Sequence, residues 1–118
     1  MATDQYHEPI ELLDEKTRDL TRIIKSIMEE FEAVDWYNQR MSATNDDELK
    51  AILKHNRDEE LEHAAMGIEW LRRQLPEFDA ELKENLFKEG PIGHHDDEEG
   101  EEEQNNRNKS LNIGKLKR

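Results

Sequence analysis

Apolar residues recur every three or four positions over two long stretches of the chain, which is the period of an amphipathic α-helix. The first stretch runs from about Pro9 to about Arg40. It contains no glycine or proline after its start and predicts a single helix of about 48 Å. The second stretch runs from about Asp46 to about Gln74. Because the connection between them is short, the pattern predicts an antiparallel two-helix hairpin.

Polar residues in the connection supply signals for the start of the second helix. Thr44 or Asn45 can cap it, and Asn45 is followed three residues later by a glutamate, as in a capping box. Pro76 either ends the second helix or opens a short third one, which Gly90 and Pro91 terminate. The predicted fold class is therefore all-α, with a short C-terminal helix after the hairpin.

Ionisable side chains interrupt the apolar row of both long helices. Glu30 stands between Ile27 and Val34, while Glu60 and His63 lie three residues apart on one face of the second helix. Burying a lone carboxylate costs several kcal/mol, whereas a divalent cation would neutralise the carboxylates and bind the imidazole. The rows are Leu13, Lys16, Leu20, Ile23, Ile27, Glu30, Val34, Tyr37 and Met41 in the first helix, and Leu49, Leu53, Asn56, Glu60, His63, Gly67 and Trp70 in the second.

The Glu-x-x-His spacing alone is a weak signal, because an exposed surface pair on an acidic helix produces it by chance. Lys16 and Asn56 also interrupt the rows, so solvated positions remain an alternative. The number of candidate ligands is more specific. Di-iron carboxylate bundles use one Glu from each of two helices and Glu-x-x-His from each of two others. This chain supplies half of that set, so two copies would complete both a four-helix bundle and its metal site.

Composition supports dimerisation and a cation ligand. Only 33% of the residues are hydrophobic and 40% are charged, which leaves a thin core for a monomer. The net charge of −13 argues against nucleic acid, whose phosphates are bound by Lys and Arg. With no cysteine, a metal must use carboxylate, imidazole or water ligands, which suit iron, manganese, zinc or calcium. No membrane span or signal peptide is evident, and we expect a cytoplasmic protein.

The last quarter of the chain changes in character. Residues 1–92 form the expected helical domain, and residues 93–109 form an acidic linker without large apolar side chains that we expect to be flexible. Residues 110–118 turn basic and regain Leu111, Ile113 and Leu116. Such a recovery of hydrophobicity after a linker is typical of a docking peptide.

Several other polar and aromatic residues are candidates with two interpretations. Glu29 and Glu32 either belong to a solvated helix face or form a secondary cation site that feeds the central one. Trp36 and Tyr37 are packing residues, or, for Tyr37, a hydrogen-bond or electron donor. Among the remaining residues, we expect Trp70 in the core and His55 at the surface.

Two sequence blocks, EEFEAVDWYNQR and HNRDEELEHAAMGIEWLRR, resemble the encapsulated ferritins, which are ferritin-like ferroxidases carried inside encapsulin nanocompartments. The resemblance covers about residues 7–92. It implies a two-helix protomer, a di-iron site at a twofold interface, and a ring-shaped homodecamer of five dimers. It assigns the iron ligands to Glu30, Glu60 and His63. Leu61 departs from the pattern, since a charged residue is expected there.

The resemblance also assigns roles to residues around the ligands and in the tail. It implies a metal entry site at Glu29 and Glu32, with Trp36 and Tyr37 near the centre. The segment SLNIGKLKR is similar to the peptide that directs cargo to an encapsulin shell protein. The residues that carry this pattern are Leu111, Ile113, Gly114 and Leu116, while Lys115 departs from it.

Together, the residues and the resemblance predict a ferroxidase that oxidises Fe(II) to Fe(III) with dioxygen and feeds iron storage inside a nanocompartment. Two alternatives stay open. The chain could bind or buffer iron without catalysis, or it could be a structural bundle in which Glu30 and His63 form a salt bridge.

Overall fold

The computed structural model describes residues 5–93, so the predicted tail, apart from Gly93, lies outside the described residues. Three α-helices follow a 3₁₀-helix (Ile10–Leu12): α1 (Glu15–Ala43), α2 (Asp47–Gln74) and α3 (Pro76–Asn85). No strand occurs in the part of the chain that is described. The all-α prediction, with a two-helix hairpin and a short third helix, is confirmed. The chain divides into two compact units, residues 1–74 and 75–118.

α1 begins later than predicted, at Glu15 rather than near Pro9. Asp14 is the reason, since its backbone is extended and its carboxylate accepts the N–H of Thr17 at 2.8 Å. This bond satisfies one of the free N–H groups of the first turn, and it lowers the pKa of Asp14 below its usual value. The residues before it form only a tight 3₁₀ turn, and Arg18 Nη2 holds that turn by donating to the carbonyl of Ile10 at 2.7 Å.

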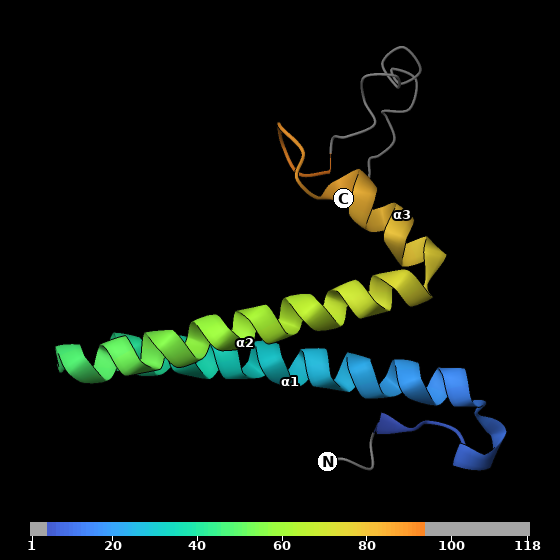
Figure 1. Ribbon diagram of the computed structural model, residues 1–118, viewed down its shortest axis with the longest axis horizontal. Helices are drawn as coiled ribbons and strands as arrows, with labels where there is room; N and C mark the ends of the chain where they lie inside the picture. The colour runs from blue at the N-terminus through green and yellow to red at the C-terminus, as the bar shows by residue number, and fades with distance from the viewer. Residues whose placement is uncertain (1–4, 94–118) are drawn as a thin grey trace. The chain divides into compact units, whose positions relative to one another are not determined.

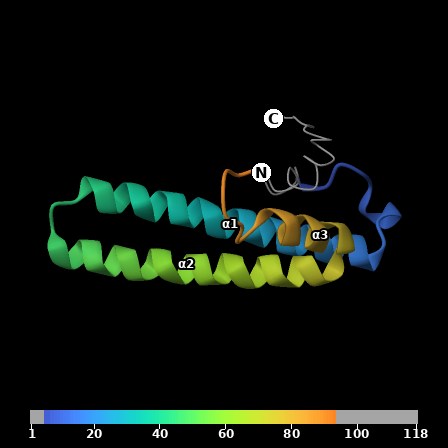
Figure 2. The same ribbon diagram turned by 90° about the horizontal axis from the view of Figure 1, so that it is seen from above.

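α1 and α2 lie side by side and run in opposite directions (Figures 1 and 2). Polar contacts tie the two ends of the hairpin. Near the connection, Arg57 Nη1 donates to Asn38 Oδ1 at 2.7 Å, and at the open end Lys16 Nζ donates to the carbonyl of Gln74 at 3.3 Å. The first contact joins a late residue of α1 to an early residue of α2, and the second joins the start of α1 to the end of α2, as an antiparallel pair requires.

The start of α2 is capped by Asp46, whereas Thr44 or Asn45 was predicted. The Asp46 carboxylate accepts the N–H of Leu49 at 2.9 Å, and the hydroxyl of Thr44 accepts the N–H of Asp46 at 3.1 Å. Asn45 and Asp46 are equally suitable cap types, so the choice depends on where the chain leaves α1. Three residues between the helices, 44–46, keep the hairpin tight.

The interface between the two long helices is thin. Within the described residues only Ala64 and Gly67 are buried, whereas the apolar row of α1 is half-buried. Ile24, Met28 and Phe31 are each more than 40% exposed. A single hairpin thus leaves much apolar surface in water, which is the condition that favours association. Dimerisation into a four-helix bundle remains a prediction.

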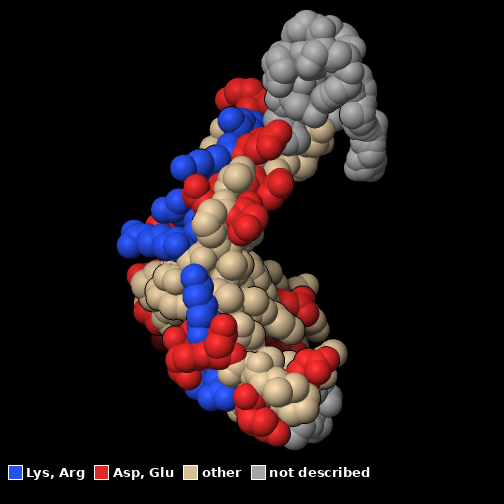
Figure 3. Space-filling model, turned by 90° about the vertical axis from the view of Figure 1, so that its right-hand side faces the viewer, with Lys and Arg blue, Asp and Glu red and all other residues tan. Residues whose placement is uncertain are grey.

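α3 opens at Pro76, as predicted, but ends at Asn85, well before Gly90 and Pro91. Leu86 is extended and Phe87 takes a left-handed backbone with φ of 57°, so the helix has already stopped before the glycine. None of the helices in residues 5–93 is both long and apolar enough to cross a membrane. On the face in Figure 3, Lys and Arg side chains lie among Asp and Glu.

Candidate metal centre

Glu30 on α1 and Glu60 and His63 on α2 come together near the middle of the hairpin. Each offers one ligand atom, and these atoms all lie within 4.8 Å of one another. The helical period explains the convergence on α2, because residues three apart share a face. The antiparallel register then sets Glu30 opposite that pair. The predicted grouping of these three residues in space is therefore present, while their roles as ligands remain a prediction.

Distances within the cluster suit an ion between the groups better than direct pairing. His63 Nδ1 lies 3.4 Å from Glu60 Oε1 and 3.6 Å from Glu30 Oε1. A charge-assisted N–H···O bond is shorter, about 2.7–2.9 Å. Ligands that each lie about 2.1 Å from one metal are themselves separated by about 3.0–3.4 Å. The triple is close to that spacing and offers the carboxylate and imidazole donors that iron accepts.

Two neighbouring carboxylates leave an unbalanced negative charge in the cluster. A hydrogen bond shared with Glu60, then burial, then the charge of Glu60 raise the pKa of Glu30 above its usual value. His63 acts in the opposite direction but does not outweigh them. Two ionised carboxylates side by side repel each other, and a cation between them would relieve that repulsion. The electrostatics therefore favour binding of a positive ion at this position.

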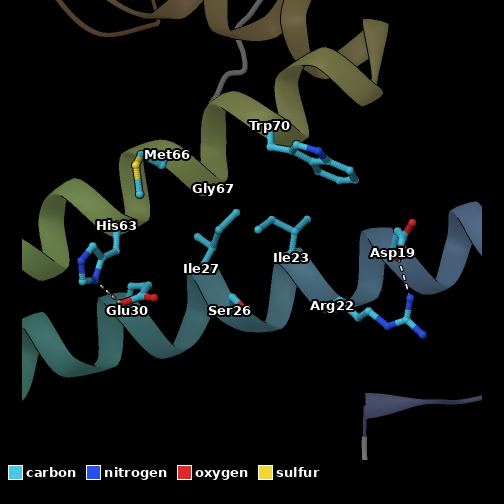
Figure 4. A pocket seen from close by; sticks show the side chains of 10 residues that line it. All are labelled: Asp19, Arg22, Ile23, Ser26, Ile27, Glu30, His63, Met66, Gly67 and Trp70. Atoms are coloured by element: carbon cyan, nitrogen blue, oxygen red, sulfur yellow. Dashed lines mark hydrogen bonds and ion pairs between the residues drawn. The ribbon is translucent and has the colours of Figure 1, made fainter.

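The cluster opens onto a groove of about 560 Å³ along the hairpin (Figure 4). The side chain of His63 is 44% exposed, against 27% for Glu30 and 24% for Glu60. Ile23, Ile27, Met66 and Trp70 supply the apolar part of the lining. One hairpin therefore provides three candidate ligands and an apolar surface beside them, and leaves room for further groups on the open side.

The charged end of the groove was not singled out from the sequence. Asp19 Oδ1 and Arg22 Nη1 form an ion pair of 2.6 Å there, and Met66 lines the groove near His63. The sequence pattern that could have indicated this end of the groove is the spacing of Asp19, Arg22 and Glu30, which lie on one side of α1. Trp70, which we expected in the core, is 39% exposed in the single chain because it stands at the edge of this groove.

The remaining candidates lie outside the cluster. Glu29 and Glu32 are exposed, and Trp36 is 48% exposed. Tyr37 is half-buried, and the guanidinium of Arg40 stands 5.3 Å from the centre of its ring. The entry-site and donor roles of these residues stay predictions.

His55 contrasts with His63 on the same helix. Its side chain is 70% exposed, and Nε2 lies 3.1 Å from the carboxylate of Glu59 one turn away. The predicted surface position of His55 is confirmed. No residue of α1 takes part in this pair, so it gives a natural control for the cluster.

Comparison with known families places these residues in a shared framework. The model of the EncFtn-like family matches residues 5–89, which include both long helices and the whole cluster. The chain belongs to the EncFtn-like family. The resemblance inferred from the two sequence blocks is thereby confirmed.

Curated relatives of this EncFtn-like chain are found in several bacteria. A ferritin-like protein of Thermotoga maritima is 49% identical over 86% of this chain and 90% of its own length. An encapsulated ferritin-like protein of Rhodospirillum rubrum is 56% identical over 77% of this chain and 65% of its own. The encapsulin nanocompartment cargo protein EncC of Myxococcus xanthus is 41% identical over 59% of this chain and 55% of its own.

A solved structure supports the fold of the EncFtn-like chain. The crystal structure of protein ne0167 from Nitrosomonas europaea has 61% sequence identity and a TM-score of 0.72. The likeness covers 75% of this chain and 98% of that one. The helical arrangement described above is thus shared with an experimentally determined protein.

Proposed function

We propose that this EncFtn-like chain is a ferroxidase that oxidises Fe(II) to Fe(III) with dioxygen as the electron acceptor. The observation that carries the proposal is the convergence of Glu30, Glu60 and His63 from two helices on one point, with carboxylate charge in excess. Fe(II) is the substrate, and each ion gives up one electron. Carboxylate ligands stabilise the more highly charged Fe(III), so they favour that loss.

The site is completed by a second copy of the chain. Three ligands from one hairpin leave coordination positions open, and the groove beside them is apolar at Ile23, Met66 and Trp70. A second hairpin about a twofold axis would cover this surface and bring another Glu30, Glu60 and His63. Two irons would then share four carboxylates and two imidazoles, the set used by di-iron carboxylate bundles.

The residues around the pair have separate tasks in this proposal. Glu60 would bridge or chelate the irons, Glu30 would supply the remaining carboxylate oxygens, and His63 would supply an imidazole nitrogen. Exposed Glu29 and Glu32 form a secondary site that feeds cations to the centre. Trp36 and Tyr37 would lie near the centre, and Tyr37 would serve as a hydrogen-bond or electron donor.

A pair of histidine variants tests the activity. After anaerobic addition of Fe(II), admission of air should give oxygen uptake and an absorbance rise in the wild-type protein. His63→Ala should lose most of the rate, while His55→Ala, on the same helix but outside the cluster, should keep it. Equal rates in the two variants would reject the assignment. Stoichiometric Fe(II) binding without oxygen uptake would instead favour an iron-binding protein without catalysis.

Native mass tests the assembly. We propose a dimer as the unit that forms the site and a decamer of five dimers as the complete particle. Mass measured with and without Fe(II) should give two irons per dimer. Wild-type dimers that form equally well with and without Fe(II) and carry no iron would instead support a structural bundle.

We further propose that the chain is cargo of an encapsulin shell and works inside a nanocompartment in the cytoplasm. The names of the relatives from R. rubrum and M. xanthus support this. The address would be residues 110–118, with contacts from Leu111, Ile113, Gly114 and Leu116, joined by the linker 93–109. All these residues except Gly93 lie outside the described part of the chain. Deletion of 110–118 should abolish co-purification with the shell protein, and survival of co-purification would refute the address.

A further inference from the structure

α1 and α2 approach each other closely at Gly67. A Cβ atom at this position would lie 2.8 Å from Ile27 Cγ1 and 3.4 Å from Ile23 Cδ1, and Figure 4 shows both isoleucines directed toward this part of α2. Side-chain carbons do not approach closer than about 3.5 Å without repulsion. A methyl group at residue 67 would therefore force the helices apart or displace Ile27.

The need for glycine here is one of space and not of backbone conformation. Gly90 and Gly93 are the described glycines with positive φ, whereas Gly67 lies inside the regular helix α2. Glycine in a helix interior is disfavoured relative to alanine. Its presence at a buried position between two isoleucines is explained by the close approach that it permits.

This contact lies directly beside the candidate ligands. Ile27 precedes Glu30 by three residues on α1, and Gly67 follows His63 by four on α2. Because the helices are antiparallel, going from Glu30 back to Ile27 and from His63 forward to Gly67 leads in the same direction along the hairpin. The contact between Ile27 and Gly67 therefore lies about one helical turn from the cluster. Metal sites require ligand distances within about 0.2 Å of their preferred values. A few tenths of an ångström added between the helices would exceed that tolerance.

We propose that Gly67 is a positioning residue, which sets the separation of α1 and α2 so that Glu30 can share a metal ion with Glu60 and His63. The inference rests on the proposed function for the identity of the ligands. The mechanism itself is steric, through Ile27, and it is defined within one hairpin. Relief of the contact from the opposite side should therefore restore the site.

The test uses the full chain with Co(II), whose visible spectrum reports ligand geometry. Gly67→Ala should weaken Co(II) affinity by at least tenfold and alter the spectrum. It should also lower the melting temperature of the metal-free protein, although alanine raises helix propensity. Ala51→Gly, at an exposed position of the same helix, is the control for propensity and should leave Co(II) affinity unchanged.

Rescue separates the steric cause from a general loss of folding. Ile27→Ala removes the γ-carbon that the new methyl group would meet, so the double variant should recover Co(II) affinity to within about threefold. This variant also keeps the test valid if Gly67→Ala alone does not fold. Unchanged Co(II) binding in Gly67→Ala, a higher melting temperature, or failure of Ile27→Ala to restore binding would each overturn the proposal.

A different result would reject only the proposed function. If His63→Ala binds Co(II) as tightly as the wild-type protein does, the cluster is not the metal site. The steric contact would then still be tested by the metal-free melting temperatures of Gly67→Ala, Ile27→Ala and the double variant. Additive effects of the two substitutions would show that residues 27 and 67 do not conflict.

Discussion

Two acidic clusters of the hairpin, one within α2 and one shared by α1 and α2, differ in how their charge is balanced. Glu69 receives Arg72 Nη2 at 2.8 Å and Arg73 Nε at 2.6 Å, and these guanidinium groups lower the pKa of Glu69 to about 2. Glu30 has another carboxylate, Glu60, beside it, and its pKa is raised. The first cluster carries its own cations, whereas the second has too few.

The difference teaches where to look for a bound ion in a chain of net charge −13. Acidic side chains are common on these helices, and most surface ion pairs contribute little to stability. The informative cluster is the one that stays short of positive charge while its ligand atoms converge from two elements.

Removal of a carboxylate from the unbalanced cluster should have the largest effect. Glu60→Ala should weaken Co(II) binding by at least about 100-fold, close to 3 kcal/mol, because a ligand and a negative charge are both lost. Glu69→Ala is the matched control and should change affinity less than twofold. Spectrophotometric titration measures both, and similar losses in the two variants would show that overall acidity, not the cluster, binds the metal.

The second largest expected effect is stabilisation of the folded protein by a bound divalent ion. At 100 times the dissociation constant, binding to the folded state alone adds about 2.7 kcal/mol. Calorimetry with and without Co(II) should therefore show a rise in melting temperature of about 10 °C. The rise should vanish in Glu30→Ala and persist in Glu69→Ala. A rise of equal size in both variants would place the stabilising ion elsewhere.

Neutralising Glu30 should stabilise the metal-free protein while destroying metal binding. Because the folded pKa of Glu30 is raised, the folded state binds more protons, and its stability falls as pH rises above the unfolded value of about 4.5. Glu30→Gln removes this effect and should add about 1 kcal/mol or less at pH 7. Urea unfolding at pH 7 and pH 4 measures the difference in free energy of unfolding between Glu30→Gln and the wild type. The stabilisation by Glu30→Gln should be smaller at pH 4. A variant less stable than the wild type at pH 7 would contradict the charge argument.

Neutralising Glu69, which is paired with Arg72 and Arg73, should destabilise the protein, and this effect should be the smallest of the four. The lowered pKa of Glu69 gives stability that is present above pH 4.5 and is lost as pH falls toward about 2. Glu69→Gln should lower the melting temperature slightly at pH 7 and hardly at all near pH 2. Added salt should also reduce the difference. A larger difference in melting temperature between the wild type and Glu69→Gln at pH 2 than at pH 7 would contradict this prediction.

Much of the cluster could be predicted because the helical period is a strong signal. Rows of apolar residues with a spacing of three and four located Glu30, Glu60 and His63 on inner faces, and the short connection gave the antiparallel pairing. The start of α1 was harder to predict from the sequence than the cluster, because Pro9 and Asp14 are both residue types that can begin a helix. Only the conformation around Asp14, held by its bond to Thr17, decides between them.

Details that depend on the distance between helices were not accessible from the sequence. Gly67 fell in the predicted row of α2, but its meaning depends on the position of Ile27 on the other helix. The exposure of Trp70 likewise depends on the groove between the helices, which it lines. The end of α3 depends on the backbone of Leu86 and Phe87, whereas the sequence offered Gly90 as the more obvious stop.

The three-residue connection at Thr44–Asp46 also bears on how quickly the hairpin folds. The contact between Asn38 and Arg57 closes a segment of 19 residues, and that between Lys16 and Gln74 closes one of 58. Loop-closure entropy grows with the length of the segment, so pairing beside the capped turn costs less entropy than pairing at the open end. Helical proteins rich in local contacts are among the fast-folding ones. The short connection therefore favours rapid pairing of α1 with α2.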